Sequence, residues 1–257
     1  MENVSDDAPQ HPATKVRTCN KHGPYEAEHL LGGIYMPCEA CMAEADAARE
    51  AAKAAEPEKP VWDPEAARLR WAGVTKRFEH ATFETYHAEN AKQRAVLELV
   101  LGYAENFRDH FKAGRSLLMV GRPGTGKTHL GFAILRQLMG ASDKFTGRLV
   151  SVAELFRTVK STWTRGSKKT EAQAIGEFLS PFLLIIDEVG VQFDSQTESN
   201  LFYEVINGRY QAMLPTVVIS NLSRNELIEV IGARSFDRMR ENGGLLATFD
   251  WESHRAR

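Results

Sequence analysis

The chain has 257 residues, 43% hydrophobic and 26% charged, as in a soluble globular protein with room for one sizeable domain and a small appendage. Its formal net charge of −2 excludes a uniformly basic nucleic-acid-binding protein, so any contact with DNA has to come from a local basic patch. The acidic start "MENVSDDAPQ" lacks the features of a secretory signal, and no apolar run approaches the roughly 18 residues that cross a bilayer. We therefore expect a cytoplasmic protein without a membrane partner.

Residues 1–45 are predicted to form a small zinc-binding module. All three cysteines of the chain lie here, in the pattern C-x₂-H-x₁₅-C-x₂-C. Two such knuckles supply four ligands that suit tetrahedral Zn²⁺ with no open position, which indicates a structural site. His29 is an alternative to the histidine of this pattern, and the alternative to a metal site is a set of unrelated thiols. The predicted zinc ligands are Cys19, His22, Cys38 and Cys41.

A helical linker is expected over residues 46–80. Residues 42–56 are rich in Ala, Glu and Lys, which are good helix formers, but they offer little to bury and therefore indicate a semi-rigid spacer. A second short helix is predicted in "DPEAARLRWAGV", where Leu69 and Trp71 are available to dock on another element.

From residue 81 to residue 257, helical and strand patterns alternate. Unbroken apolar runs at 116–120 and 182–187 are bounded by structure-breaking residues, as in strands that are buried on both faces. The segments "GRLVSV" and "TVVISN" look similar, and helical patterns lie between the runs. This alternation predicts an α/β domain of three layers around a parallel sheet.

Residues 121–128, "GRPGTGKT", fit the phosphate-binding pattern G-x-x-x-x-G-K-[ST] between a strand and a helix. Its glycines let successive backbone N–H groups point at an anion, and the helix adds the positive end of its dipole. Lys127 is predicted to reach the β- and γ-phosphates, and the Thr128 hydroxyl to ligate Mg²⁺. The predicted ATP-binding residues are Gly121, Arg122, Pro123, Gly124, Thr125, Gly126, Lys127, Thr128 and His129.

Polar residues at two further strand ends are predicted to complete this site, because ligands of open parallel sheets bind at the carboxyl ends of the strands. Asp187 and Glu188 follow the run "FLLII". Asp187 can hold the metal, and Glu188 can orient the attacking water as general base. Asn221 follows "TVVIS" and can bond the γ-phosphate or that water; the alternative is an asparagine that only forms a turn.

The segment 156–170, "FRTVKSTWTRGSKKT", carries five basic residues and no acid. Lys160 and Trp163 are three apart on the predicted helix. A lysine for phosphate and an aromatic side chain for base stacking are typical of single-stranded DNA binding. The alternative is a solvated basic loop with Trp163 in the core.

Residues 233–244, "ARSFDRMRENGG", place Arg234 and Arg238 on one helix face, while Phe236 and Met239 point elsewhere. A solvated helix face is the ordinary explanation. In a ring-forming hydrolase, however, a neighbour's arginine completes each site by neutralising charge on the transferring phosphoryl group. We therefore expect Arg238, together with Arg234, to reach the site of a second copy, which predicts self-association through the ATP site.

Together, "GRPGTGKTHL", "LLIIDEVGVQ", "VVISN", "RSFDRMR" and "FDWESHRAR" resemble the DnaC-type replicative helicase loaders of the AAA+ superfamily. The resemblance implies an ATPase, weak in isolation, that uses ATP to deliver a hexameric, DnaB-like replicative helicase onto single-stranded DNA at replication initiation. By position, Arg238 matches the family's arginine finger and Arg255 another arginine of its tail. The 19 residues after Arg238 are too few for a full helical lid. Some phage and Gram-positive loaders are similar in having an N-terminal zinc module.

Three other functions share part of this pattern. An IstB-like ATPase that assists a transposase has the same phosphate loop and "DE" pair, and it is the main alternative. A zinc-dependent DNA-binding adaptor would bind ATP without hydrolysing it. A small-molecule kinase would need only the first acid and an acceptor-binding insertion, which the sequence does not show. The zinc pattern, "DRMR" and the tail favour the loader.

Overall fold

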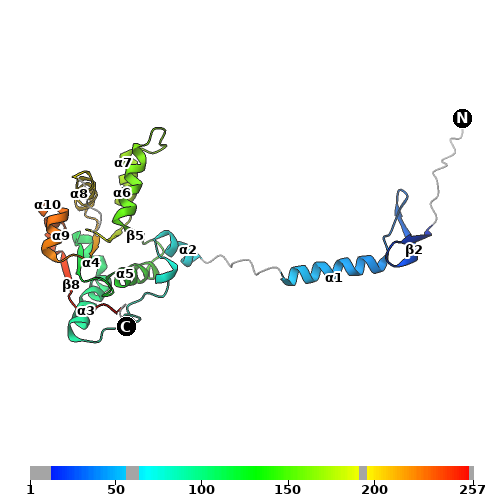
Figure 1. The fold of residues 1–257 in the computed structure, drawn as a ribbon, viewed down its shortest axis with the longest axis horizontal. Coiled ribbons are helices and arrows are strands. Elements are labelled where there is room, and N and C mark those ends of the chain that lie inside the picture. The colour runs from blue at the N-terminus through cyan, green and yellow to red at the C-terminus, as the bar shows by residue number, and fades with distance from the viewer. Residues whose placement is uncertain (1–12, 56–63, 191–195, 255–257) are drawn as a thin grey trace. The chain divides into compact units, whose positions relative to one another are not determined.

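The computed structural model describes residues 13–55, 64–190 and 196–254 (Figure 1). The chain divides into two compact units, Met1–Trp62 and Asp63–Arg257. This division falls inside the predicted linker 46–80, so the second half of that segment folds with the larger unit. Among the described residues, no helix combines the length and the hydrophobicity needed to cross a membrane.

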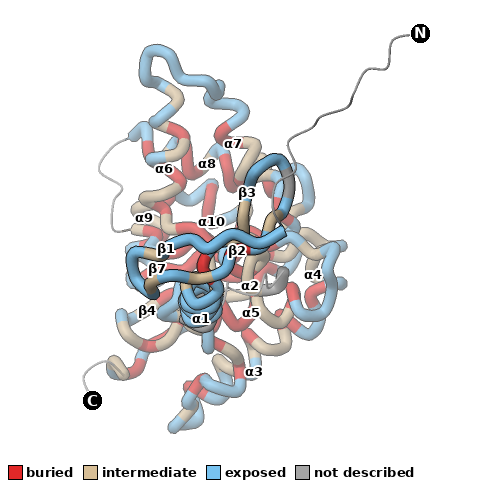
Figure 2. Tube along the Cα trace, turned by 90° about the vertical axis from the view of Figure 1, so that its right-hand side faces the viewer, coloured by how far each residue is buried: buried red, intermediate tan, exposed pale blue. Residues whose placement is uncertain are grey.

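The smaller unit contains an antiparallel sheet of β1 (Thr14–Cys19), β2 (Gly23–Leu31) and β3 (Ile34–Tyr35), followed by helix α1 (Glu39–Ala55). In its described part, only Ala27 and Cys38 are buried hydrophobic residues. Figure 2 accordingly shows β1 and α1 almost wholly exposed. The strands were not predicted, because a sheet with so small a core leaves little apolar pattern in the sequence.

The larger unit is built on a five-stranded parallel sheet in the order β5-β6-β7-β4-β8. Its strands are β4 (Leu117–Gly121), β5 (Gly147–Ser151), β6 (Leu183–Asp187), β7 (Thr216–Ser220) and β8 (Leu245–Phe249). The predicted parallel sheet is confirmed. Strand β8 was missed because it is an edge strand, with only Ala247 and Phe249 buried, and so lacks an unbroken buried run.

Helices cover both faces of this sheet, which confirms the three layers. Successive residues of a strand point to opposite faces, so Leu117 packs in one core cluster and Leu118 in another. One face carries α3 (Ala91–Glu105), α4 (Phe107–Ala113) and α5 (Lys127–Ala141). The other carries α6 (Val152–Lys160), α7 (Glu171–Leu179), α8 (Gln196–Gln211), α9 (Arg224–Ile231) and α10 (Ala233–Arg240). Short 3₁₀ turns are η1 (Lys76–Phe78), η2 (Ser161–Trp163) and η3 (Glu241–Gly243).

Helix α2 (Pro64–Trp71) packs on the larger unit beside α5 and β5. Leu69 docks there as predicted, in a cluster with Ala72 and Met139. The backbone N–H of Leu149 donates to the carbonyl oxygen of Ala72 at 2.8 Å, which ties this segment to the edge of the sheet. Trp71 does not dock within this unit and is 63% exposed.

A buried arginine joins three elements of the larger unit. Arg209 of α8 is fully buried, and burial lowers the pKa of its guanidinium to about 9. It donates to backbone carbonyl oxygens at the end of α7 and before β6 and β7. The acceptors include those of Phe178 at 2.8 Å and Pro215 at 2.7 Å. After β8, residues 250–254 contain no α-helix.

Candidate functional site

The phosphate loop, residues 121–128, connects β4 to α5, and its three glycines, Gly121, Gly124 and Gly126, have positive φ angles that other residues adopt only with strain. Gly124 and Gly126 have φ angles of +73° and +94°, in the left-handed region. A Cβ atom on Gly124 would lie 2.0 Å from the Ser253 hydroxyl oxygen, and one on Gly126 would lie 2.4 Å from the Tyr86 ring. The loop therefore needs glycine for its backbone conformation and for its packing.

Two segments that are distant in the sequence donate hydrogen bonds to carbonyl oxygens of this loop. The Tyr86 hydroxyl, which precedes α3, donates to the carbonyl oxygen of Thr125 at 3.0 Å. The backbone N–H of His254, in the C-terminal tail (residues 250–254), donates to the carbonyl oxygen of Gly124 at 3.0 Å. Neither contact was predicted from the sequence. Together they tie the loop to two segments that are distant in sequence.

Lys127 is the first residue of α5, and its side chain lies inside the loop. Its ammonium donates to the carbonyl oxygens of Gly121 at 2.8 Å and Arg122 at 2.6 Å. The residue is 4% exposed. This places a buried positive charge where the loop and the positive end of α5 meet, as an anion-binding site requires.

Thr128 and Asp187 lie side by side at the next position. The Thr128 hydroxyl donates to the Asp187 carboxylate at 2.8 Å, and the backbone N–H of Glu188 donates to the other carboxylate oxygen at 2.7 Å. Burial raises the pKa of Asp187, and these two hydrogen bonds oppose the rise. A hydroxyl beside a buried carboxylate is a fitting pair of oxygen ligands for Mg²⁺, which would also compensate the buried charge.

Glu188 has a φ angle of +59°, which is strained for a residue with a side chain. The conformation is held by its neighbour: the N–H of Val189 donates to the Ile219 carbonyl oxygen at 3.0 Å, and the Ser220 hydroxyl donates to the Val189 carbonyl oxygen at 2.6 Å. Both bonds come from β7, which ends directly before Asn221. The sheet therefore fixes the direction of Glu188 and Asn221 together.

These groups surround one cavity of about 200 Å³. It is lined by Arg77, Phe78, Pro123, Gly124, Gly126, Lys127, Thr128, His129, Asp187, Glu188 and Asn221. The structure thus brings the predicted loop, metal and water-orienting residues together. His129 is fixed here by the Thr82 carbonyl oxygen, 2.7 Å from its Nε2. Arg77 and Phe78 were not predicted, because η1 lies in the segment taken for a linker and the sequence gives no sign that it folds back.

The two predicted arginines of α10, Arg234 and Arg238, do not line this cavity. The Arg238 guanidinium carbon is 4.3 Å from the centre of the Tyr210 ring, and its Nη1 is 3.9 Å from the Glu241 carboxylate. Hydrogen bonds to Tyr203 and Tyr210 raise the pKa of Arg238. Neither Arg238 nor Arg234 is among the described residues that line the cavity, so a role in an ATP site requires a second copy. Arg255 lies outside the described residues.

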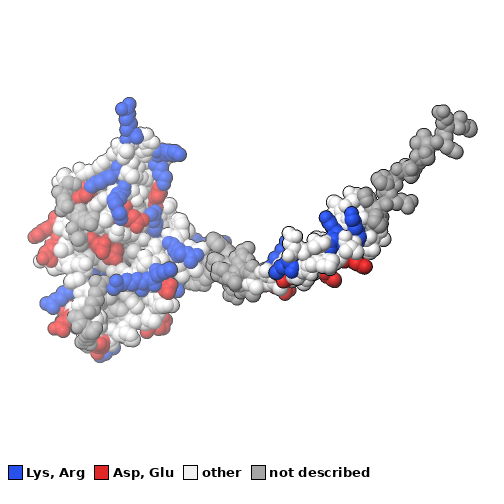
Figure 3. All heavy atoms as spheres, turned by 45° about the vertical axis from the view of Figure 1, so that its right-hand side comes forward, with Lys and Arg blue, Asp and Glu red and all other residues white. Residues whose placement is uncertain are grey.

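The basic segment 156–170 joins α6 to α7. Lys160 ends α6, and Trp163 lies in η2 rather than on the same helix. Lys160 is paired with the Glu198 carboxylate at 2.6 Å. Trp163 is 51% exposed, so it is not a core residue, and its indole N–H donates to the Glu171 carboxylate. Figure 3 shows Lys and Arg side chains at the end of the larger unit where α6 and α7 project in Figure 1.

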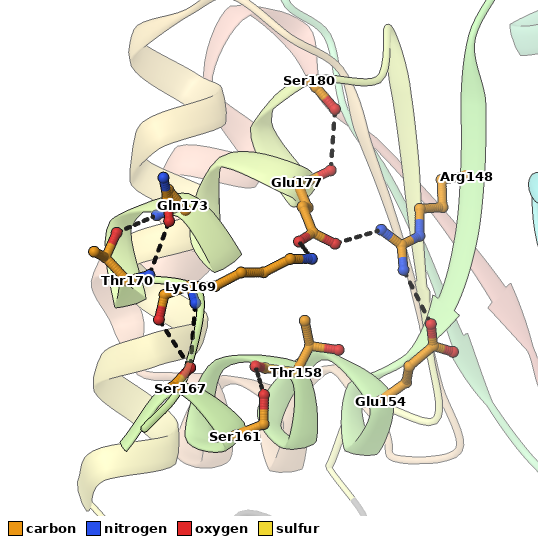
Figure 4. A network of polar contacts seen from close by, with 10 residues as sticks. All are labelled: Arg148, Glu154, Thr158, Ser161, Ser167, Lys169, Thr170, Gln173, Glu177 and Ser180. Atoms are coloured by element: carbon orange, nitrogen blue, oxygen red, sulfur yellow. Dashed lines mark hydrogen bonds and ion pairs between the residues drawn. The ribbon is translucent and has the colours of Figure 1, made fainter. Parts of the chain in front are cut away.

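An ion-pair network fixes these two helices to the sheet (Figure 4). Arg148 of β5 lies 3.1 Å from the Glu154 carboxylate of α6 and 3.8 Å from the Glu177 carboxylate of α7. Glu177 also pairs with Lys169 at 2.5 Å. Arg165 and Lys168 have no such partner among the described residues. Their charges are therefore exposed in the connection between α6 and α7, which we call the tip.

The four predicted metal ligands of the smaller unit converge. Their ligand atoms, three sulfurs and Nδ1 of His22, all lie within 4.8 Å of one another. The distances from His22 Nδ1 are 3.7 Å to Cys19, 3.5 Å to Cys38 and 3.3 Å to Cys41. Tetrahedral Zn²⁺ with ordinary bond lengths needs ligand separations of about 3.5–3.8 Å, so the set fits zinc. His29 lies outside the cluster and accepts from the N–H of Gly33 at 3.2 Å.

Groups around the cluster favour metal binding. The backbone N–H groups of Lys21 and His22 lower the pKa of the Cys19 thiol to about 6. The hydrogen bond with Cys19 raises the pKa of Cys41 to about 11, as expected when neighbouring thiols share protons. On the far side of the His22 ring, Nε2 lies 3.3 Å from the Glu44 carboxylate, which also pairs with Lys21. Such a carboxylate keeps the proton on Nε2 and leaves Nδ1 free to bind a metal.

Comparisons with known proteins agree with this geometry. The family model described as IstB-like ATP binding protein matches residues 65–238. The replicative helicase loader DnaC of Buchnera aphidicola subsp. Schizaphis graminum is 34% identical over 184 residues, which are 72% of this chain and 73% of that protein. DnaC of Escherichia coli (strain K12) is 31% identical over 186 residues, 72% of this chain and 74% of that protein. A crystal structure of the DnaC helicase loader matches the fold with a TM-score of 0.60 at 24% identity, covering 68% of this chain and 99% of that one.

Proposed function

This chain belongs to the IstB-like ATP-binding protein family and, within it, to the DnaC-type replicative helicase loaders of AAA+ fold, and from that membership we propose that it uses ATP to load a hexameric helicase onto single-stranded DNA. The helicase is the kind of partner that the relatives' name states. The observation that carries the ATPase part of the proposal is the cavity where the phosphate loop meets Asp187, Glu188 and Asn221.

The proposed hydrolysis assigns one role to each group. Lys127 and the backbone N–H groups of the loop bind the β- and γ-phosphates, and Thr128 and Asp187 hold Mg²⁺. Glu188 accepts a proton from the attacking water, which forms a bond to the γ-phosphorus as the bond to the β-bridging oxygen breaks. Asn221 orients that water.

Arg238 of a second copy is proposed to complete the site, with Arg234 beside it. A guanidinium stabilises charge that develops on the γ-phosphoryl oxygens, an effect of about 10³–10⁵ in rate where it has been measured. Because neither arginine lines the cavity of its own chain, the isolated subunit should be a weak ATPase. Self-association through the ATP site follows from this assignment.

Single-stranded DNA is proposed to bind at the tip between α6 and α7. Trp163 offers a half-exposed ring for base stacking, and Arg165 and Lys168 carry charges without a carboxylate partner in the described residues. Lys160 is already paired with Glu198, so its contribution to phosphate binding should be smaller than the sequence suggested. Replacement of Trp163 by Ala should weaken binding of a labelled oligonucleotide about 5- to 100-fold. Unchanged affinity would remove this surface from the proposal.

Zn²⁺ is the proposed metal of the N-terminal unit, where it has a structural role. The sulfur-rich ligand set and its separations support this choice.

The test of the main proposal uses the full-length chain with its helicase. Glu188→Gln should retain ATP binding but lose hydrolysis, because the amide cannot accept the proton. Glu98→Gln, the same change at an exposed position of α3, serves as the control. ATP turnover by Glu188→Gln at the wild-type rate would contradict the assigned chemistry. Failure of the wild type to place a hexameric helicase on a single-stranded circle would contradict the loading function.

A transposase-assisting ATPase of the IstB type is the second candidate, favoured by the match of the family model itself. Recovery of a transposase rather than a hexameric helicase on the purified protein would support it. The identity of 34% to a helicase loader over 73% of that protein favours loading.

A further inference from the structure

We propose that Arg77 is a phosphate-binding residue of the ATP site in its own subunit, where it contacts the terminal phosphate of ATP. This inference rests on the proposed ATPase function and assigns the residue a role that acts without a second copy. Arg77 lies on η1, upstream of the phosphate loop by 44 residues (77 to 121) and outside every ATP-binding motif recognised in the sequence.

The position of Arg77 follows from the two cavities that it lines. One is the 200 Å³ cavity of the phosphate loop, and the other is a cavity of about 610 Å³ that Arg70 and Trp71 of α2 also line. Both are lined by Arg77 and Phe78, and both include Thr128, Asp187 and Glu188. Arg77 therefore lies near the residues proposed to hold Mg²⁺ and to orient the attacking water. The terminal phosphate of ATP would bind beside these residues.

The backbone that carries Arg77 is fixed to the ATPase domain. The Phe78 ring stacks on the Phe132 ring of α5 with centres 4.7 Å apart, one helical turn from Thr128. Upstream, the Arg68 guanidinium of α2 pairs with Asp143 at 2.6 Å, and Leu149 binds the chain directly after α2. The side chain of Arg77 thus extends from a fixed point beside the cavity of the phosphate loop.

No described residue neutralises the charge of Arg77. The residue is exposed and has no hydrogen bond or ion pair to any described residue, whereas Arg148 and Lys160 each face a carboxylate. A guanidinium presents two parallel N–H groups that match two phosphate oxygens, and it is favoured over an ammonium for this contact. Because Lys127 also lines this cavity, Arg77 would add a second cation to the terminal phosphate.

The experiment compares nucleotide affinities of the full-length chain. Kd values for a non-hydrolysable ATP analogue and for ADP are measured with Mg²⁺ at fixed salt, at protein concentrations where the chain is monomeric. The variants are Arg77→Ala and Arg77→Lys, and the matched control is Lys76→Ala. Lys76 is exposed on the same turn but is not among the residues that line either cavity.

Arg77→Ala should raise the Kd of the ATP analogue about 10- to 100-fold, and that of ADP less than about 3-fold, because ADP lacks the phosphate that is bound. Arg77→Lys should recover part of the loss, and Lys76→Ala should match the wild type. Equal affinity of Arg77→Ala and wild type for the ATP analogue, or equal weakening of both nucleotides, overturns the assignment. If the wild type itself bound no ATP, the proposed function would fail, which is a different result. A thermal unfolding curve for Arg77→Ala that overlays that of the wild type shows that the fold is intact.

Discussion

Replacement of His22 by Ala should release the zinc of the N-terminal unit, whereas replacement of His29 should not. The two histidines were both candidate ligands in the sequence, but only His22 has a ring nitrogen within 3.7 Å of all three sulfurs. His29 instead accepts from the Gly33 N–H and packs against Tyr35. The pair therefore forms a matched test of the geometry.

The expected magnitude follows from the number of ligands. A structural zinc contributes about 10–16 kcal/mol in small zinc peptides. Shared among the four ligand atoms of this site, that is about 2.5–4 kcal/mol each, or about 70- to 900-fold in Kd. Because the unit has only Ala27 and Cys38 as buried hydrophobic residues in its described part, it should unfold when the metal leaves.

The assay is zinc competition between the full-length protein and a chelating indicator, with elemental analysis of the dialysed protein. Limited proteolysis then reports whether the N-terminal unit has unfolded. The larger unit has its own core, so its thermal transition should stay unchanged in His22→Ala. Retention of zinc by His22→Ala, or its loss from His29→Ala, would refute this reasoning about the site.

Three further changes test other features. Arg209→Met leaves four backbone carbonyl groups without their donor, and at roughly 1–3 kcal/mol per buried group the unfolding free energy in urea should fall by about 4 kcal/mol or more. The exposed control Arg108→Met should stay within about 0.5 kcal/mol, and a similarly small loss in Arg209→Met would be contrary evidence. Met213→Gly relieves a φ angle of +55° and should raise the unfolding free energy by about 0.5–1 kcal/mol; a lower melting temperature would speak against strain at this position. Glu44→Gln removes the carboxylate that orients His22 and should raise the zinc Kd about 10- to 100-fold, so an unchanged Kd would show that the contact has no such role.

The parts of the molecule that the sequence predicted are those with a local signal. The phosphate loop needs its glycines and lysine within eight positions, and the buried strands before Asp187 and Asn221 are continuous apolar runs. The metal ligands are likewise close in sequence within each knuckle. In each case the chemistry and the spacing are set by neighbouring residues.

The parts that were missed depend on contacts between distant segments. Strand β8 is defined by its pairing with β4, which is distant in the sequence. Segment η1 joins the site because the Phe78 ring stacks on the Phe132 ring of α5. The pairing of Lys160 with Glu198 joins positions 38 apart, so the basic segment looked more available for DNA than it is. No pattern in a short window carries this information.

The contact between His254 and Gly124 bears on how the protein should be handled in the laboratory. The last described residues rest on the loop that cradles the nucleotide, through one backbone hydrogen bond and the Ser253 side chain. A fluorescent label attached at Ser253 or His254 would disturb this contact and distort measured nucleotide affinities. Labels for such measurements belong at positions away from the phosphate loop and from residues 250–254.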